Sequence, residues 1–331
     1  MELLSVTMND GVKLRSEIEG KDNSSEDKSN YKIVRKGDMV YNSMRMWQGA
    51  NGISPCDGIV SPAYTVLMPK QEINNGYFAA LFKSVKLINE FRKNSQGMTS
   101  DTWNLKYPQI ETIKVQIPSV SEQEKVSKLF SVLDERIAAQ AQLVESLKKY
   151  KRGLIKLVFE QTSMEEQKQL PLSEMCISIS SGRTTVSDTN GSFPLFGSTG
   201  VVGKTNTVEF DGDIVLVARV GANAGRVNYY SGRCAVTDNT LVICVKEGII
   251  QAKFLAYFLE YYDLHRLIFG SGQPLVTGGQ LKKIEMPLVS SATQGCITKR
   301  FEALDNIIEA QETYALNLSR LKSGLMQQLF I

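Results

Sequence analysis

Residues that could carry out covalent chemistry are few in this chain. A single histidine, His265, stands in an expected helix or just past its end. One histidine cannot supply the paired ligands of a His-rich metal site, and no Gly-x-Ser-x-Gly elbow is present to activate a serine beside it. The five cysteines are scattered, odd in number and never in a Cys-x-x-Cys pair, which is typical of reduced thiols in a cytoplasmic protein. We predict no catalytic residue and no metal site.

Two glycine-rich segments invite a nucleotide-binding interpretation that their spacing does not support. Residues 197–205 (GSTGVVGKT) place five residues between the first Gly and the Gly-Lys pair, whereas a phosphate loop needs four. Residues 206–210 are expected to form a strand rather than the helix whose N-terminus would bind phosphate. Residues 221–225 (GANAG) lack the dinucleotide spacing, and the Asn/Asp-Pro-Pro-Tyr/Phe tetrapeptide of amino-methyltransferases is absent. Any chemistry must therefore come from a partner.

The composition is that of an ordinary globular protein. The 331 residues are 42% hydrophobic and 22% charged, enough for two domains with their own cores. No apolar run approaches the roughly 20 residues of a membrane span, and the first residues do not match a signal peptide. A net charge of only +3 does not by itself indicate a nucleic-acid partner, so any such binding must use local patches.

The elements that must position these residues are set by an internal repeat. Aligning residues 123–159 with residues 294–330 without a gap gives 13 identities in 37 positions. The identities include the first pair, Gln123 and Gln294, and the last pair, Phe159 and Phe330. The chain is therefore two copies of one unit, each a region of about 120 residues followed by a long helix.

Spacing within the repeat predicts that the two helices pack along their length. Apolar residues step by four and three positions, which is the heptad pattern of a coiled coil. One Gln and one Lys recur in each seam, and polar seam residues restrict register and partner choice. Two unrelated amphipathic helices covering separate cores remain the alternative for either helix alone. Helices of about 38 residues would be roughly 57 Å long. The residues predicted to pair the helices are Phe130, Leu133, Ile137 and Leu147 in the first copy and Phe301, Leu304, Ile308 and Leu318 in the second.

The two regions before the helices share an order of expected elements. In the first, strands are predicted at residues 39–41, 63–67 and 113–117, and a helix at residues 76–91. In the second, strands are predicted at residues 214–218, 240–245 and 284–288, and a helix at residues 249–264. Ser121 with Glu124 is expected to cap the first long helix.

The two regions differ at their starts. The second opens with residues 172–200, whereas the first has no counterpart to residues 172–183. Residues 3–6 correspond instead to residues 195–198. We therefore expect the first domain to be incomplete at its N-terminus.

Several motifs together resemble a known family. They are KGDMVYNSMRMWQGA (36–50), GIVSPAY (58–64), IPSVSEQ (117–123), FPLFGSTG (193–200), ARVGANAG (218–225) and VTDNT (236–240). With the repeat, they resemble the specificity (S) subunit of type I restriction–modification systems over nearly the whole chain.

The resemblance implies an α+β fold with two pseudo-repeated α/β target-recognition domains, each followed by a long helix. The two helices would pair as an antiparallel coiled coil and set the domains at opposite ends. The implied boundaries are 1–120 for the first domain, 121–161 for its helix, 162–169 for a linker, 170–290 for the second domain and 291–331 for its helix. Each domain would read one half of a split site in double-stranded DNA.

The resemblance also implies partners. Modification (M) subunits would dock on the helices and methylate adenine with S-adenosylmethionine, and restriction (R) subunits would cut DNA using ATP and Mg²⁺. The chain itself would be a non-catalytic, cytoplasmic subunit that binds no metal. The alternative is a scaffold protein that binds M subunits without specific DNA reading by its first half.

Candidate DNA contacts are polar and basic residues on loops between strands, because phosphate contacts position a protein and base-edge contacts specify its target. For each of them a solvated surface residue is the alternative interpretation. We expect Trp47 to belong to the core, and Asp38 and Asp213 to hold turns. The candidates are Ser43, Arg45, Gln48 and Gln96 in the first domain and Arg183, Ser198, Lys204, Arg219, Asn223, Arg226 and Gln273 in the second.

Overall fold

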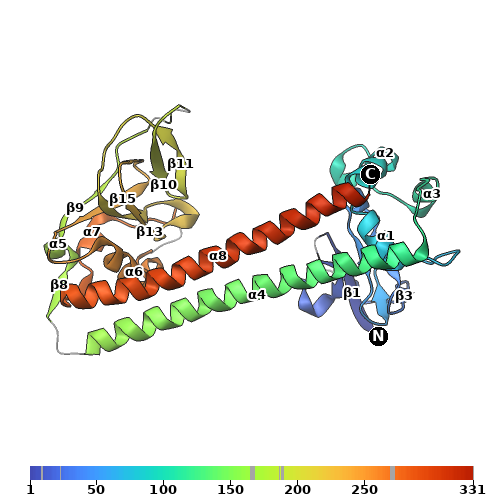
Figure 1. Ribbon diagram of the computed structural model, residues 1–331, viewed down its shortest axis with the longest axis horizontal. Helices are drawn as coiled ribbons and strands as arrows, with labels where there is room; N and C mark the ends of the chain where they lie inside the picture. Colours follow the sequence, from blue (N-terminus) through green and yellow to red (C-terminus); the bar gives the residue numbers. More distant parts are fainter. Residues whose placement is uncertain are drawn as a thin grey trace. The chain divides into compact units, whose positions relative to one another are not determined.

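The computed structural model describes residues 1–331 except residues 9, 23, 165–167, 186, 188–189, 269–272 and 331. The chain has an α+β fold and divides into two compact units (Figure 1). Unit 1 comprises residues 1–142 and 312–331, and unit 2 comprises residues 143–311. Each unit contains part of both long helices, α4 (Val120–Met164) and α8 (Ser291–Leu329). None of the helices described has the length and apolar character needed to cross a membrane.

Unit 1 is built on two small sheets. One has the order β2-β1-β6-β3 and the other β5-β4-β7. Three short helices follow the sheets. The elements are β1 (Glu2–Thr7), β2 (Gly11–Leu14), β3 (Lys32–Val34), β4 (Met39–Asn42), β5 (Asn51–Ile53), β6 (Gly58–Val60), β7 (Tyr64–Leu67), α1 (Asn75–Leu81), α2 (Val85–Asn94) and α3 (Tyr107–Ile110).

Unit 2 contains sheets of the order β11-β10-β14, β13-β12-β15-β9 and β16-β8. Its elements are β8 (Gln169–Pro171), α5 (Leu172–Met175), β9 (Cys176–Ser181), β10 (Phe193–Gly197), β11 (Gly200–Thr205), β12 (Asp213–Ala218), β13 (Val227–Ser231), β14 (Ala235–Val236), β15 (Thr240–Val245), α6 (Ala252–Tyr262), α7 (Gly278–Lys282) and β16 (Glu285–Pro287).

The two units share a strand topology. Strand β1 pairs antiparallel with β2 and parallel with β6, just as β10 pairs antiparallel with β11 and parallel with β14. Strand β4 lies between β5 and β7, as β12 lies between β13 and β15. The predicted equivalence of residues 3–6 with residues 195–198 is therefore confirmed. At the edge of this sheet the units differ, because β15 also pairs with β9, whereas β7 is an edge strand.

The repeated glutamines explain how each long helix is attached to its domain. Gln123 is buried, and its Oε1 accepts a hydrogen bond from the Asn74 backbone N–H at the start of α1, at 2.9 Å. Gln294 is equally buried, and its Oε1 accepts from the Gln251 backbone N–H at the start of α6, at 2.8 Å. The same bond in both units aligns Asn74 with Gln251. Positions on α1 and α6 can be compared from this common point.

The long helices pair antiparallel within each unit, as predicted. In unit 1, Phe130 stacks on Phe330 with ring centroids 5.8 Å apart, and Asp134 forms an ion pair with Lys322. The repeat-equivalent contacts recur in unit 2, where Phe159 lies 6.4 Å from Phe301 and the Lys151 ammonium lies 2.7 Å from a carboxylate oxygen of Asp305. In each case, the residue that α4 contributes in unit 1 is equivalent to the residue that α8 contributes in unit 2. The pairing is therefore reciprocal.

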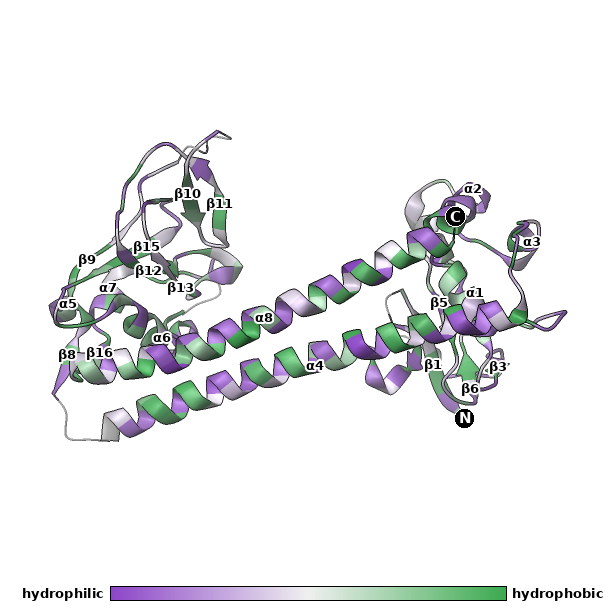
Figure 2. Cartoon of the chain, viewed as in Figure 1, coloured by the Kyte–Doolittle hydropathy of each residue, from purple (hydrophilic) through white to green (hydrophobic). Residues whose placement is uncertain are grey.

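The residues predicted to pair the helices differ in how far they are buried. Hydrophobic residues recur along both helices (Figure 2). At the end of α8, Leu329, which continues the heptad steps, is exposed and Phe330 is buried, because 3.6 residues per turn drift against a strict heptad. Phe130, Leu133, Phe301, Leu304, Ile308 and Leu318 are buried, while Ile137 and Leu147 are partly buried.

The two units differ in the charge at one aligned position beside the paired long helices. In unit 2, Glu260 on α6 lies 3.2 Å from Lys151, and burial raises the pKa of the Glu260 carboxyl. The aligned position in unit 1 is Lys83. Burial, and next the positive charge of Lys322, lower the pKa of Lys83. Unit 1 therefore places two cations near each other where unit 2 has an ion pair.

Two predicted elements of the first region are wrong. The helix expected at residues 76–91 is two helices, because Ser84 caps α2 by accepting a hydrogen bond from the Leu87 N–H. The strand expected at residues 113–117 is absent. Its counterpart β16 pairs with β8, and no described segment of unit 1 offers an equivalent partner.

Two boundaries and one further predicted strand also differ from expectation. The first long helix is capped by Ser119 with Glu122, two positions before the predicted pair. It continues to Met164, through the start of the expected linker 162–169, of which residues 165–167 lie outside the described part. Residues 206–210 form no strand and contribute one bridge, between Phe210 and Cys234.

Candidate functional site

Unit 1 presents two loops that are fastened together, here called loop pair 1 (residues 43–50 and 95–105). The first joins β4 to β5, and Gly49 closes its short helical turn with a φ of 83° that favours glycine. The Leu105 backbone N–H donates to the Ser43 carbonyl at 2.8 Å, and Gln96 bridges to Asn104 within the second loop. The loops therefore form a single surface.

Three of the four predicted residues of this domain project from loop pair 1. Arg45 and Gln96 are exposed, and Gln48 is partly exposed. Ser43 does not project. It is buried, and its hydroxyl donates to the Ala63 carbonyl at 2.7 Å, so it fixes the loop instead of facing a ligand.

Trp47 lies on this surface and not in the core, contrary to expectation. Its ring is partly exposed and meets Trp103 edge to face, with centroids 5.1 Å apart. The Arg92 guanidinium lies 5.8 Å from the Trp47 ring centroid, which is within cation–π range. The sequence argument missed Trp103 and Arg92. A large aromatic residue inside the polar segment 99–104 was the available signal.

Unit 2 repeats the arrangement in loop pair 2 (residues 219–226 and 273–277). Its first loop joins β12 to β13 through a short helical turn at Gly221–Asn223. The Val276 N–H donates to the Arg219 carbonyl at 2.9 Å, and the Gly221 N–H donates to the Pro274 carbonyl at 3.1 Å. The bond from Val276 to Arg219 matches that from Leu105 in unit 1. The same device therefore fastens both loop pairs.

Four predicted residues meet on loop pair 2. Arg226 and Gln273 are exposed, while Arg219 and Asn223 are partly exposed. The Arg219 Nε is buried and finds no hydrogen-bond acceptor among the described residues. Since buried N–H groups are usually paired, the Arg219 guanidinium is a candidate to receive an acceptor from a ligand.

The other three predicted residues lie on or beside the sheet β11-β10-β14. Arg183 is exposed just after β9, next to Thr184, whose N–H donates to the Val236 carbonyl at 3.0 Å. Ser198 lies in the turn between β10 and β11. Lys204 is exposed on β11. The structure therefore places these residues on a different element from the loops.

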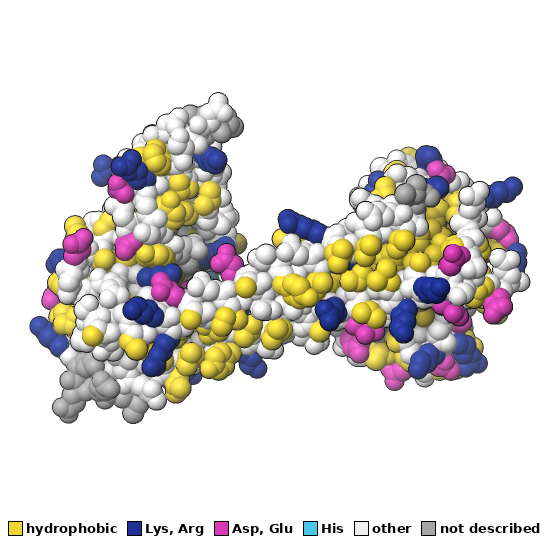
Figure 3. All heavy atoms as spheres, viewed as in Figure 1, with side chains coloured by type: hydrophobic (Ala, Val, Ile, Leu, Met, Phe, Trp, Pro, Cys, Tyr) yellow, Lys and Arg dark blue, Asp and Glu magenta, His cyan; other side chains and the backbone are white. Residues whose placement is uncertain are grey.

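The outer faces of the long helices carry a second repeated feature. Leu143 and Tyr314 are equivalent in the repeat and are 44% and 43% exposed. One heptad further, Tyr150 and Leu321 are 62% and 52% exposed. Hydrophobic side chains follow the helices on the visible face (Figure 3). Exposed apolar positions therefore recur at equivalent places on the two helices.

Reactive groups do not converge. Among the residues that the structure describes, no group of three or more His, Cys, Asp or Glu side chains could hold a metal ion. His265 is exposed, and its Nδ1 lies 3.0 Å from a carboxylate oxygen of Asp263. Burial raises the pKa of the Cys176 and Cys234 thiols to about 11, so both stay protonated near neutrality.

Comparisons with known proteins agree with this arrangement. The profile of the type I restriction modification DNA specificity domain matches residues 7–149 and again residues 164–318. The MjaVIII type I specificity subunit of Methanocaldococcus jannaschii is 25% identical over 344 residues, covering 90% of this chain and 79% of that protein. The EcoprrI specificity subunit of Escherichia coli is 27% identical over 135 residues, covering 40% of this chain and 32% of that subunit.

Solved structures show the same fold. The S subunit of a type I restriction–modification system from M. genitalium superposes with a TM-score of 0.63 at 17% identity, covering 91% of this chain and 84% of that one. A chain from a structure describing complex assembly and conformational transition of the type I system gives 0.61 at 18%, covering 92% and 84%. The double profile match, one in each half, shows that the chain belongs to the DNA specificity family of type I restriction–modification systems.

Proposed function

We propose that this subunit reads a bipartite target in double-stranded DNA, with loop pair 1 and loop pair 2 each contacting one half-site. The observation that carries the proposal is the recurrence of the fastened loop pair, once per unit, between equivalent strands. Two related reading surfaces in one chain correspond to the two half-sites that a symmetric dimer would bind.

The exposed side chains have the chemistry that base reading requires. Arginine pairs with the O6 and N7 acceptors of guanine, and Asn or Gln pairs with adenine. Loop pair 1 offers Arg45 and Gln48, and loop pair 2 offers Arg219 and Asn223. Gln48 and Asn223 both end the short helical turn of their loop. The exposed cations Arg183 and Lys204 are assigned to phosphates, which position the protein without specifying sequence.

Partner binding is assigned to the outer faces of α4 and α8. The exposed residues Leu143 and Tyr150 on α4 are matched by Tyr314 and Leu321 on α8, so an M subunit can find the same apolar site on each helix. In this proposal, the subunit has no active site, and S-adenosylmethionine, ATP and Mg²⁺ bind to the M and R subunits. Two equivalent sites predict two M subunits per chain.

The test is DNA selection by the complex with its cognate M subunit. Selection from random duplexes should give a two-part motif, and a purely salt-dependent affinity without a motif would contradict sequence reading. Arg219→Ala should relax one half of that motif, because a bidentate base contact discriminates by about 1–3 kcal/mol, or roughly 5- to 150-fold.

A matched control is available in the same unit. Arg233 is exposed and paired with Asp211 at the other end of β13 from the loop. Arg233→Ala should leave the motif unchanged. Arg45→Ala should relax the other half-site, with a smaller effect than Arg219→Ala. If Arg45→Ala changes nothing while M subunits still bind, the first half acts as a scaffold.

A further inference from the structure

A short turn in unit 2 connects the two groups of candidate DNA contacts. It comprises residues 237–239, between β14 and β15, and is here called the connecting turn. The Arg219 backbone N–H donates to the Asn239 carbonyl at 2.9 Å, which attaches the turn to loop pair 2. The Thr237 N–H donates to the Phe196 carbonyl at 2.8 Å, which attaches it to the hairpin of β10 and β11. Loop pair 2 and the hairpin therefore adjoin the same turn.

The segment that carries Arg183 is attached at the ends of the connecting turn. The Thr184 N–H donates to the Val236 carbonyl at 3.0 Å, and the Gly182 N–H donates to the Thr240 carbonyl at 3.1 Å. Val236 directly precedes the turn and Thr240 directly follows it, so Arg183 lies beside it. The candidates for base reading and for phosphate contact are thus joined into one surface.

Two side chains of the connecting turn are exposed and unengaged. Asp238 and Asn239 are both exposed, and neither side chain forms a hydrogen bond or an ion pair with another residue that the structure describes. The Arg219 guanidinium, on the adjoining loop, is likewise in no ion pair with a described residue. An exposed carboxylate and a guanidinium on adjoining segments therefore both remain available to a ligand.

The chemistry of these two side chains suits base edges better than phosphates. A carboxylate repels the phosphate backbone, so on a surface that faces DNA it needs a hydrogen-bond donor on a base. In the major groove the amino group of cytosine is such a donor, and Asp or Glu is the side chain that accepts from it. Asparagine pairs with the N6 and N7 atoms of adenine. Asp238 and Asn239 therefore match two different bases.

Unit 1 has the equivalent turn without these polar groups. It comprises residues 61–63, and the Ser43 N–H attaches it by donating to the Ala63 carbonyl at 3.3 Å. The two exposed residues of this turn are Pro62 and Ala63. Neither side chain has a polar atom, so this turn cannot read a base edge through side-chain hydrogen bonds.

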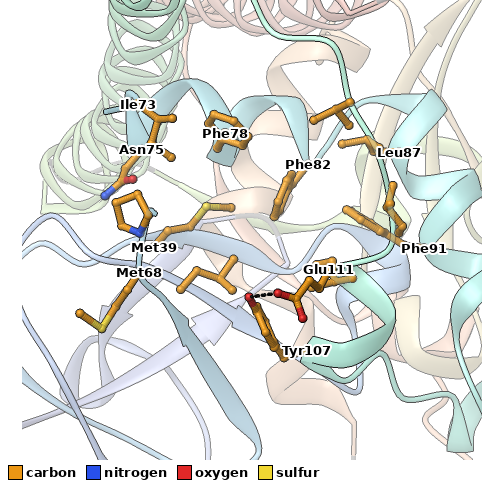
Figure 4. Close-up of a pocket in the computed structure, with 15 residues that line it drawn as sticks. Met39, Met68, Ile73, Asn75, Phe78, Phe82, Leu87, Phe91, Tyr107 and Glu111 are labelled. Atoms are coloured by element: carbon orange, nitrogen blue, oxygen red, sulfur yellow. Dashed lines mark hydrogen bonds between the residues drawn. The ribbon is translucent and has the colours of Figure 1, made fainter. Parts of the chain in front are cut away.

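A cavity of about 250 Å³ in unit 1 does not supply the missing groups. Its walls come from β4, β7, α1, α2 and α3, and Phe78, Phe82 and Phe91 face it (Figure 4). The Tyr107 hydroxyl in its wall donates to the Glu111 carboxylate at 3.0 Å, so these two polar groups are already paired. Base edges are distinguished mainly by hydrogen bonds, and an apolar cavity is therefore not assigned to them.

We propose, on the basis of the DNA reading proposed above, that the connecting turn is a third reading segment of unit 2. Asp238 accepts a hydrogen bond from the amino group of a cytosine, and Asn239 pairs with an adenine. Because the turn is bonded to loop pair 2 through Arg219, the three segments read one half-site together. The second half-site is then read at more base positions than the first.

The test is selection of random duplexes by the complex with its cognate M subunit. Asp238→Ala should relax one position that prefers cytosine, and Asn239→Ala one position that prefers adenine, both in the half-site that Arg219→Ala affects. Discrimination at that position should fall by roughly 5- to 150-fold. Because both side chains are exposed, the melting temperature should not change. A motif that both variants leave unchanged would overturn the role of the turn.

Asp211 provides a matched control for the loss of a carboxylate. It is exposed and paired with Arg233, at the ends of β12 and β13 that lie away from loop pair 2. Asp211→Ala should leave the motif unchanged. Asp238→Asn should bind random-sequence DNA more tightly, because it removes repulsion of phosphates, and should still relax the cytosine position. Tighter binding with an unchanged motif would show that Asp238 only repels the backbone.

A modified base tests the assigned hydrogen bond directly. N4-methylcytosine at the selected position puts a methyl group in place of the hydrogen that Asp238 would accept. It should weaken the wild-type complex by roughly fivefold or more and leave the Asp238→Ala complex unaffected. Equal weakening of the two complexes would refute the contact. A wild-type complex that selects no motif contradicts DNA reading as a whole, whereas a motif insensitive to both variants contradicts only the connecting turn.

Discussion

Gln294 makes three side-chain hydrogen bonds, two of which join the start of α8 to the start of α6. Besides accepting from the Gln251 N–H, its side-chain amide donates to the Ile249 carbonyl at 2.9 Å and to the Val289 carbonyl at 3.0 Å. Gln294→Met keeps a side chain of similar size and removes all three bonds. Each buried backbone group left unpaired costs about 1–3 kcal/mol, and we expect a total of ~3–5 kcal/mol after partial relaxation.

Gln123 provides the internal comparison, because its side chain makes two hydrogen bonds where that of Gln294 makes three. Its Oε1 accepts from the Asn74 N–H and its Nε2 donates to the Pro118 carbonyl, both at 2.9 Å. Gln123→Met should therefore cost ~2–4 kcal/mol, less than Gln294→Met. The difference is about one hydrogen bond.

Native-state hydrogen exchange measures both effects locally. A loss of 3 kcal/mol corresponds to roughly 150-fold faster exchange at the Gln251 amide in Gln294→Met. The Asn74 amide should keep its protection in that variant, and the reverse should hold for Gln123→Met, because the two sites belong to different compact units and share no hydrogen-bond partner. An unchanged exchange rate at Gln251, or equal losses in the two variants, would refute the reasoning.

Three further outcomes are expected. Tyr150→Ser with Leu321→Ser should weaken binding of the M subunit by at least tenfold in pull-down titrations, while the melting temperature stays within a few degrees, since both side chains are exposed. Leu133→Asp should destabilise unit 1 by ~3 kcal/mol in denaturant unfolding because it buries a charge in the helix seam, and unchanged unfolding would exclude that pairing face. Lys83→Glu should stabilise unit 1 by ~1 kcal/mol at pH 7 by replacing repulsion from Lys322 with attraction. Because the pKa of Lys83 is lowered in the folded protein, the folded state binds the Lys83 proton less tightly than the unfolded state does. The free energy of unfolding should therefore rise with pH as the pH approaches the ordinary value of 10.5. This rise should vanish in Lys83→Glu.

Features that depend on sequence periodicity were predictable. The repeat at Gln123 and Gln294 predicted two related halves, and the heptad steps predicted paired helices. Features that depend on tertiary partners were not. Whether residues 113–117 form a strand depends on a neighbour like β8, and Ser43 is buried because Ala63 lies beside it. A serine at position 43 does not by itself indicate that contact.

Among the loop residues, sequence reasoning found the surfaces but not all of their members. Arg45 and Arg219 stood out because basic residues in glycine-bounded loops are natural candidates. Trp103 stood outside the motifs, and its meeting with Trp47 requires the second loop to fold back over the first. That contact arises from the bond between Leu105 and Ser43, which links residues far apart in the sequence.

The placement of Phe330 affects the order in which the protein folds during synthesis. Unit 2 is one uninterrupted stretch of chain, residues 143–311, whereas the core of unit 1 needs Phe330 beside Tyr77 and Phe130. The domain that leaves the ribosome first is therefore completed last, and it must wait for the final turn of α8. Until then its apolar surface is open to chaperones and to aggregation. A stop codon just before Phe330 would thus damage the half of the protein most distant from it in sequence.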